Sequence, residues 1–139
     1  MTTPVSDRQY RTGRKIKVKK IEKTKPDSIL NAVKAAAKIA DEKKADYIRI
    51  LDMRSRLIIT DYFMIISAKN TRLTRRIEEE ICFNLKKKKL YPRSITGASE
   101  GNWILVDYDD FVIHIFTEEF RQFYDLERLW KDSEEIKWE

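Results

Sequence analysis

Residues 103–116 read WILVDYDDFVIHIF and hold two apolar runs separated by a short polar step. We predict a β-hairpin here, with Asp109 and Asp110 as its two turn residues. Aspartate tolerates the left-handed backbone of hairpin turns better than most residues other than glycine. In this register Trp103 lies opposite Phe116. Because one face of such a hairpin is apolar, helices must cover it, and this requirement sets the fold class.

Alternation along the two strands gives the hairpin two unlike faces. The first face is apolar and must meet the helices; its residues are Ile104, Val106, Tyr108, Phe111, Ile113 and Ile115. The second face mixes large apolar groups with a carboxylate and an imidazole; its residues are Trp103, Leu105, Asp107, Val112, His114 and Phe116. Another helix of the chain or a partner protein would cover such a mixed face. An aromatic side chain with a polar edge often dominates a binding interface.

The Tyr-x-Asp-Asp pattern also resembles the metal-binding hairpin of template-copying polymerases. A two-metal site needs several carboxylates around ions ~3.5–4 Å apart, and Asp52 is the only evident carboxylate from a neighbouring strand. The chain has three glycines and none forms a phosphate-binding loop. A metal-dependent nucleotidyl or phosphoryl transferase that uses Asp107, Asp109 and Asp110 therefore stays as an alternative to a binding function.

The chain has one histidine and one cysteine, so no ligand spacing indicates a zinc site. His114 lies diagonally from Asp107 on the predicted hairpin, where the two can form a hydrogen bond. A structural histidine explains this position better than a general base. Cys82 cannot form an internal disulfide and is expected to be inert. We therefore predict no catalytic residue, no cofactor and no metal site.

Two strands and a helix are predicted ahead of the hairpin. Apolar residues at helical spacing predict a helix over 29–44, capped by Asp27 or Ser28. The segments 47–53 and 61–68 are predicted strands, and the second is apolar enough for a central strand covered on both faces.

A second long helix is predicted from Asn70 or Thr71 to Lys89. Its apolar stripe repeats every four residues and consists of Leu73, Ile77, Ile81 and Leu85. Pro92 prevents its continuation, a short strand is expected at 94–97, and residues 117–131 predict one or two short helices. The resulting class is a single α/β domain with a mixed sheet of about five strands flanked by helices.

Charge is distributed unevenly along the chain. Residues 1–26 hold nine basic and two acidic residues, which predicts a flexible basic tail, and the remaining 27–139 form the domain. Residues 69–93 hold nine basic and three acidic residues, whereas residues 94–139 hold four basic and twelve acidic residues. This asymmetry can orient a charged partner over ~8–10 Å in physiological salt.

A generic RNA-binding module is the second alternative. It would use the basic tail together with the run Lys86–Lys89. The same lysines lie at the end of a predicted helix and interact well with its dipole, so a solvated helix end explains them better than an RNA-binding patch.

Nothing in the composition indicates secretion or a membrane. The single cysteine favours a reducing compartment. No apolar run approaches the ~18–20 residues of a membrane span, and the N-terminal residues lack the apolar core of a secretion signal. We expect a cytoplasmic protein that does not enter a membrane.

Three motifs in order resemble the ribosomal silencing factor family, also called Iojap-like proteins. They are SRLIITDYFMIISAKNTRLTRRIEEEI (55–81), GASEGNWILVDYDDFVIHIF (97–116) and RQFYDLERLW (121–130). The resemblance covers about residues 46–132 and leaves the tail uncovered. It implies a mixed sheet flanked by helices, distantly similar to nucleotidyltransferases but without their catalytic residues.

The resemblance also implies a function without chemistry. Family members bind the large ribosomal subunit through large-subunit ribosomal protein number fourteen, block association with the small subunit and repress translation. Homodimers are also implied. The composition of the basic tail leaves two interpretations: it rests on nucleic-acid phosphates, such as those of ribosomal RNA, or it is a solvated extension without a defined partner.

The family motifs transfer to particular residues of this chain. The Gly-x-Trp motif falls on Gly101 to Trp103, and the family's tryptophan faces the ribosomal protein. The turn motif falls on 107–110, where Asp109 replaces the usual glycine. The Thr-Asp-Tyr-Phe motif matches 60–63, and the final motif matches 124–130, with burial expected for Phe63, Leu126 and Leu129. The predicted partner-binding residues are Trp103, Asn102, Leu105, Asp107, His114 and Phe116.

Overall fold

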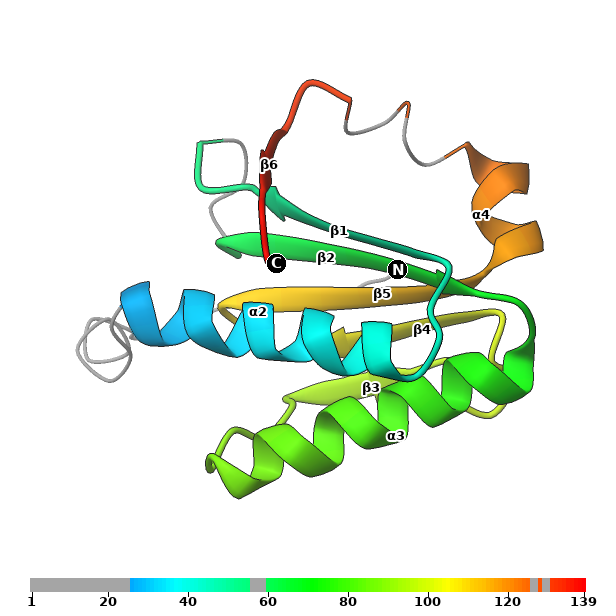
Figure 1. Ribbon diagram of the computed structural model, residues 1–139, viewed down its shortest axis with the longest axis horizontal. Coiled ribbons are helices and arrows are strands. Elements are labelled where there is room, and N and C mark those ends of the chain that lie inside the picture. Colours follow the sequence, from blue (N-terminus) through cyan, green and yellow to red (C-terminus); the bar gives the residue numbers. More distant parts are fainter. Residues whose placement is uncertain (1–25, 56–59, 126–127, 129–130) are drawn as a thin grey trace. The chain divides into compact units, whose positions relative to one another are not determined.

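The computed structural model describes residues 26–55, 60–125, 128 and 131–139. A compact unit runs from Ala32 to Glu139, and the first turns of the first helix belong to the segment before it. The elements, labelled as in Figure 1, are α2 (Pro26–Glu42), β1 (Tyr47–Asp52), β2 (Tyr62–Ala68), α3 (Thr71–Lys87), β3 (Ser94–Thr96), β4 (Trp103–Asp107), β5 (Phe111–Thr117), α4 (Glu118–Tyr124) and β6 (Glu134–Ile136). Apart from Pro26, the predicted basic tail lies outside the described residues.

The strands form one mixed sheet in the order β3-β4-β5-β2-β1-β6. β2 and β5 are parallel, and every other neighbouring pair is antiparallel. β2 lies inside the sheet and nearly all of its residues are buried, which confirms the predicted central strand. The mixed α/β class is therefore confirmed, with β6 as a strand that the sequence pattern did not reveal.

The hairpin has the predicted register. Trp103 pairs with Phe116 and Asp107 pairs with Val112. Asp109 adopts a φ of 70°, the left-handed conformation that the turn requires. Because strand residues alternate between faces, this register separates the apolar face from the face that carries Trp103.

α3 follows its predicted course. The Asn70 side chain caps its first turn by accepting a 2.9 Å hydrogen bond from the Leu73 amide. The buried stripe contains Ile77, Ile81 and Leu85, all without exposed surface. Leu73 is only half-buried, and the fully buried Thr74 occupies the first place of the stripe.

α2 begins earlier than predicted. Pro26 is its first residue, so Asp27 and Ser28 lie within the first turn and do not cap it. Proline is favoured in the first turn because the amide that it lacks would have no partner there. Ala32, Ala36, Ala37 and Ala40 of α2 are buried, whereas Ala35 is half-buried. In Figure 1 the part of α2 from Ala32 on crosses the same face of the sheet as α3.

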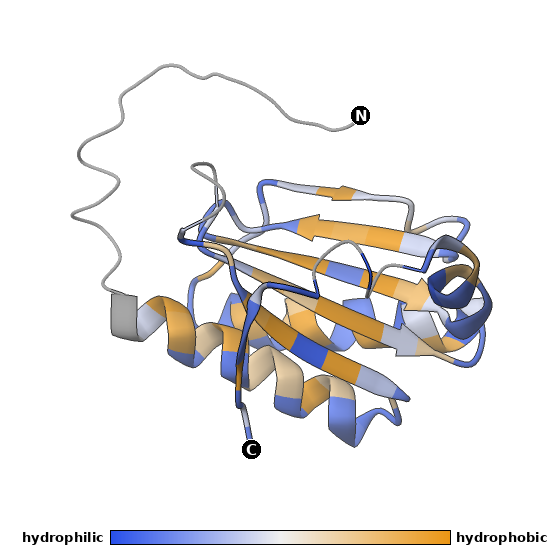
Figure 2. Ribbon diagram, turned by 90° about the horizontal axis from the view of Figure 1, so that it is seen from above, coloured by the Kyte–Doolittle hydropathy of each residue, from blue (hydrophilic) through white to orange (hydrophobic). Residues whose placement is uncertain are grey.

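The two faces of the sheet are covered differently. α3 and the part of α2 from Ala32 on cover one face, which carries Ile50, Met64, Ile104 and Ile113, all without exposed surface. α4 lies against β2 and β5 on the other face. There a smaller core of Leu51, Met53, Ile65 and Phe116 packs against Tyr47, Phe63 and Phe120. Figure 2 shows that the strands are largely apolar, whereas the C-terminal segment is largely hydrophilic. We call the face with this smaller core the open face.

None of the helices within the described residues has the length and apolar character of a membrane span.

Candidate functional site

The loop between β3 and β4 fixes the position of Trp103. Gly97 and Gly101 both have positive φ values, of 83° and 81°. A Cβ on Gly97 would lie 2.2 Å from the Trp103 carbonyl oxygen, and a Cβ on Gly101 would lie 2.8 Å from the Thr71 Cβ. Only glycine therefore allows this close approach of the loop to β4 and α3.

Hydrogen bonds hold the same loop from both sides. The Thr74 hydroxyl donates to the Gly101 carbonyl at 2.6 Å, and this bond is buried. The Thr117 amide donates to the Asn102 carbonyl at 3.0 Å. Trp103 thus follows a segment fixed to both α3 and the end of β5.

The Trp103 side chain lies on the open face over two buried rings. Its Nε1 donates a 3.2 Å hydrogen bond to Nδ1 of His114. Its ring centroid is 5.0 Å from that of Phe116, which has no exposed surface. Even so, 41% of Trp103 is exposed. The indole is therefore held in one orientation while much of its surface faces solvent.

Burial determines the charge state of His114. Desolvation lowers its pKa to about 4, so the imidazole is neutral at pH 7. A neutral ring can accept the Trp103 hydrogen bond, which an imidazolium cannot. Its burial and its hydrogen bond to Trp103 favour the predicted structural role for the histidine. The predicted hydrogen bond to Asp107 stays a prediction.

α4 extends the exposed aromatic area beyond Trp103. The Tyr124 ring centroid is 6.2 Å from that of Trp103 and 5.0 Å from that of Phe123. Tyr124 is 48% exposed and Phe123 is 78% exposed. We call Trp103, Phe123 and Tyr124 the aromatic surface. Three large rings exposed together are the kind of group that anchors protein interfaces.

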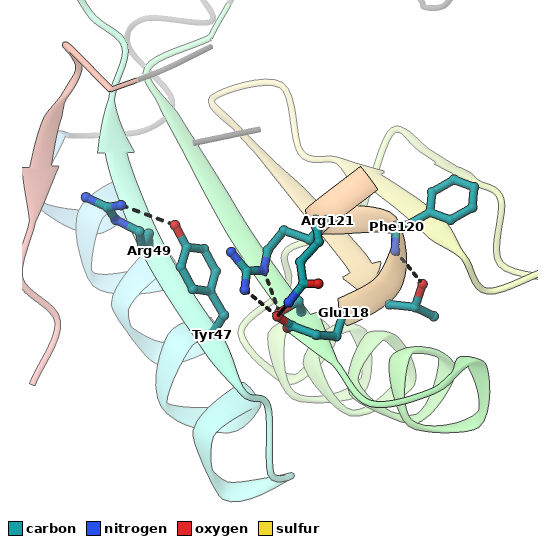
Figure 3. A network of polar contacts seen from close by, with 8 residues as sticks. Tyr47, Arg49, Glu118, Phe120 and Arg121 are labelled. Carbon is teal, nitrogen blue, oxygen red and sulfur yellow. Dashed lines mark hydrogen bonds and ion pairs between the residues drawn. The ribbon is translucent and has the colours of Figure 1, made fainter. Parts of the chain in front are cut away.

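A polar network fixes α4 on the open face (Figure 3). The Arg121 guanidinium donates to the Glu118 carboxylate and, at 3.2 Å, to the Ser67 hydroxyl. The Ser67 hydroxyl in turn donates to Glu118 at 2.8 Å. Desolvation alone would raise the pKa of Glu118, but these hydrogen bonds outweigh it and lower the pKa. The carboxylate therefore stays charged and paired at neutral pH.

The network continues across the sheet to its far edge. The Arg121 guanidinium carbon lies 4.0 Å from the centroid of the Tyr47 ring. Arg49 donates to the Tyr47 hydroxyl at 3.2 Å and forms a 2.6 Å ion pair with Glu135 of β6. In Figure 3 the side chains of Arg49, Tyr47 and Arg121 follow one another across β1 and β2. α4 and the C-terminal strand are therefore connected through Tyr47.

The aspartates of the hairpin turn support the turn itself. The Asp107 carboxylate accepts a 2.8 Å hydrogen bond from the Asp109 amide. Asp109 forms a 2.7 Å ion pair with Arg93, and the Asp110 carbonyl accepts from the Asp61 amide at 2.9 Å. Within the described residues, no group of three or more histidine, cysteine or carboxylate side chains is placed to hold a metal ion. The transferase alternative thus lacks a converging carboxylate set in this part of the chain.

Cys82 is half-buried, and burial raises the pKa of its thiol to about 11. A thiol with such a pKa is almost entirely protonated at pH 7, in agreement with the inert role predicted for it.

The predicted partner-binding residues separate into two groups. Trp103 is exposed, and Asn102, Leu105 and Asp107 are half-buried. His114 and Phe116 are buried beneath the indole and support it from below. Their alternation on the hairpin correctly placed them on one face, but alternation does not reveal depth.

Phe123 and Tyr124 are absent from the predicted binding residues. Both residues lie in the third family motif, RQFYDLERLW (121–130). Alternation and spacing do not show whether the residues of this motif contact a partner or lie in the core. Leu126 and Leu129, for which burial is expected, lie outside the described residues. Most of the second short helix predicted before residue 131 also lies outside them.

The fold is shared with proteins of known structure. A crystal structure of a Chromobacterium violaceum protein superimposes with a TM-score of 0.71 at 24% identity, and the match covers 74% of this chain and 86% of that one. This similarity defines the class of protein as a single-domain α/β fold with a mixed sheet.

Sequence comparison defines the family. A family model described as "Ribosomal silencing factor during starvation" matches residues 26–139. The ribosomal silencing factor RsfS of Bacillus subtilis strain 168 is 34% identical over 101 residues, which cover 73% of this chain and 86% of that protein. The mouse protein "Mitochondrial assembly of ribosomal large subunit protein 1" is 32% identical over 95 residues, which cover 64% of this chain and 40% of that protein. The chain belongs to the ribosomal silencing factor family.

Proposed function

We propose that this protein binds the large ribosomal subunit through large-subunit ribosomal protein number fourteen and represses translation in the cytoplasm without catalysing a reaction. The aromatic surface is the observation that carries the proposal. Trp103, Phe123 and Tyr124 are exposed by 41%, 78% and 48%, although two buried rings and a polar network fix their positions. Side chains that are rigid before binding lose less conformational entropy at an interface.

Charge supports a basic partner. Residues 94–139, which supply β4, β5 and α4, hold twelve acidic and four basic residues. Ribosomal proteins are generally basic, so opposite charge would speed the encounter and set its orientation. Asn102, Leu105 and Asp107 would form the half-buried rim of the contact. His114 and Phe116 would act through the indole that they support.

Steric exclusion is the proposed mechanism. The bound protein occupies a surface of the large subunit that the small subunit needs, so the two subunits do not join. The name of the mouse relative also refers to the large ribosomal subunit. The basic residues 1–26 would rest on ribosomal RNA phosphates, where each neutralised phosphate would make binding more dependent on salt.

Sucrose-gradient sedimentation tests this function. Purified large and small subunits are mixed under conditions that favour joining, with and without an excess of this protein. The protein is expected to sediment with the large subunit and to reduce the joined ribosome peak. An unchanged joined peak at saturating protein would overturn the proposal. Sedimentation of the free protein tests the homodimer that the family resemblance implies.

A further inference from the structure

We propose that the C-terminal end of α3 and the turn after it form a second interaction surface, which binds single-stranded RNA. This surface consists of Phe83, the run Lys86–Lys89 and Tyr91, and we call it the basic aromatic surface. α3 covers the face of the sheet opposite the open face, so this surface is separate from Trp103 and α4.

Two aromatic rings are exposed here among positive charges. Phe83 is 58% exposed and Tyr91 is 62% exposed. The Lys87 Nζ lies 4.6 Å from the centroid of the Phe83 ring. The stretch 82–93 contains five basic residues and no acidic residue. Within the described part of the chain, none of the lysines 86–89 forms an ion pair with a carboxylate.

The backbone holds this surface in a defined shape. Lys89 adopts a φ of 65°, and the Leu90 amide donates back to the Leu85 carbonyl at 3.0 Å, which closes the helix end. Beyond the turn, the Arg93 amide donates to the Asp107 carbonyl at 2.7 Å. The lysines and Tyr91 are thus presented by a turn that is fixed at both ends.

The helix dipole alone does not explain the arrangement. Positive side chains in the last turn of a helix interact favourably with its dipole, and this accounts for Lys86 and Lys87. It gives no reason for two exposed rings on either side of the lysine run. Rings among cations match a single nucleic acid strand, in which unpaired bases stack on aromatic side chains and phosphates contact lysines. The choice of RNA follows from membership of a ribosomal family.

Fluorescence anisotropy of the full-length protein with a labelled oligouridine of about 12 nucleotides, a length within the usual site sizes, tests the inference. Phe83→Ala is expected to weaken binding about tenfold because a stacking ring is lost. Phe123→Ala is the matched control, since it removes an exposed ring from α4 and should leave oligouridine binding unchanged. Phe83→Trp should bind oligouridine about as tightly as the wild type, because tryptophan also stacks on bases.

A second pair of variants separates this surface from overall charge. Lys87→Gln/Lys88→Gln should reduce the slope of log affinity against log salt by about 1.4, at ~0.7 per phosphate of a single strand. Lys38→Gln/Lys44→Gln removes the same charge from exposed positions on and just after α2 and should leave the slope nearly unchanged. Equal effects in the two lysine pairs, or wild-type affinity in Phe83→Ala, would overturn the inference. The oligouridine assay contains no ribosome. A negative result would therefore overturn the RNA-binding inference without testing the proposed block of subunit joining.

Discussion

Nε1 of Trp103 donates a 3.2 Å hydrogen bond to Nδ1 of His114, so the orientation of an exposed side chain depends on a buried one. His114 is only 6% exposed, whereas Trp103 is 41% exposed. Their connection fixes the indole on the open face and makes its orientation depend on the neutral state of the imidazole.

Trp103→Ala should weaken binding to the large subunit by ~2 kcal/mol or more, because the substitution removes the central ring of the aromatic surface. Trp103→Phe should lose less, since it keeps a ring over Phe116 but not the hydrogen bond. Co-pelleting at a series of subunit concentrations measures the affinity. Circular dichroism melts check that both variants are folded, and wild-type affinity in a folded Trp103→Ala would contradict the site.

Tyr124→Ala and Phe123→Ala should each reduce the same affinity, by ~1–2 kcal/mol, because α4 supplies the outer part of the aromatic surface. The control Lys38→Ala changes an exposed residue of α2 and should bind like wild type. If both α4 variants bind as tightly as the control, the contact is confined to β4.

Stability should fall between pH 7 and pH 5 because of His114. Its folded pKa of about 4 lies below the ordinary value of 6.5, so the unfolded chain binds the proton more readily and stability declines as the pH falls through this window. The histidine should contribute a decrease of ~2 kcal/mol by pH 5. Urea unfolding at several pH values measures it, and His114→Gln should show a correspondingly flatter profile. Identical profiles would mean that the histidine does not titrate in this way.

Arg121→Met should lower both the stability of the domain and its affinity for the large subunit. The guanidinium contacts Glu118, Ser67 and the Tyr47 ring, and removing it leaves a partly buried carboxylate without its cation; we expect a loss of ~1–3 kcal/mol in stability. Arg128→Met is the control because the Arg128–Asp125 pair is exposed and such pairs contribute ~0–1 kcal/mol. Urea midpoints of the two variants are compared. Equal midpoints would show that the network does not stabilise α4.

Asp109→Gly should keep or slightly raise stability, whereas Asp109→Ala should lower it by ~1 kcal/mol. The reason is the φ of 70° at this position, which glycine adopts without steric cost. Both variants lose the exposed Arg93 ion pair, so their difference isolates the backbone effect. Urea unfolding of the two variants measures it, and an alanine variant as stable as the glycine variant would argue against the strain.

Much of the fold could be predicted from the sequence because its signals are local. The register of the hairpin follows from alternation around Asp109 and Asp110, and the start of α3 follows from the capping side chain of Asn70. β6 could not be predicted, since Glu134 and Glu135 are charged and their strand exists only through pairing with β1. Pro26 was interpreted as the end of the tail although a proline equally well begins a helix.

The candidate site was predicted less completely. The hairpin pattern placed His114 and Phe116 correctly on the face of Trp103 but gave no measure of their depth. That depth depends on side chains of other elements: Phe63 lies against His114, and Phe120 packs against the cluster that contains Phe116. The sequence did not single out Phe123 and Tyr124 as candidate contacts, because the exposed side of a seven-residue helix depends on how tertiary contacts orient it.

Only three residues of β6 close the outer border of β1, where they pair with Ile50, Leu51 and Asp52. Proteolytic trimming after Ser133 would uncover amides and carbonyls along that border, ready to recruit a strand from a neighbouring molecule. These three residues therefore cover a strand edge that would otherwise be open to intermolecular pairing.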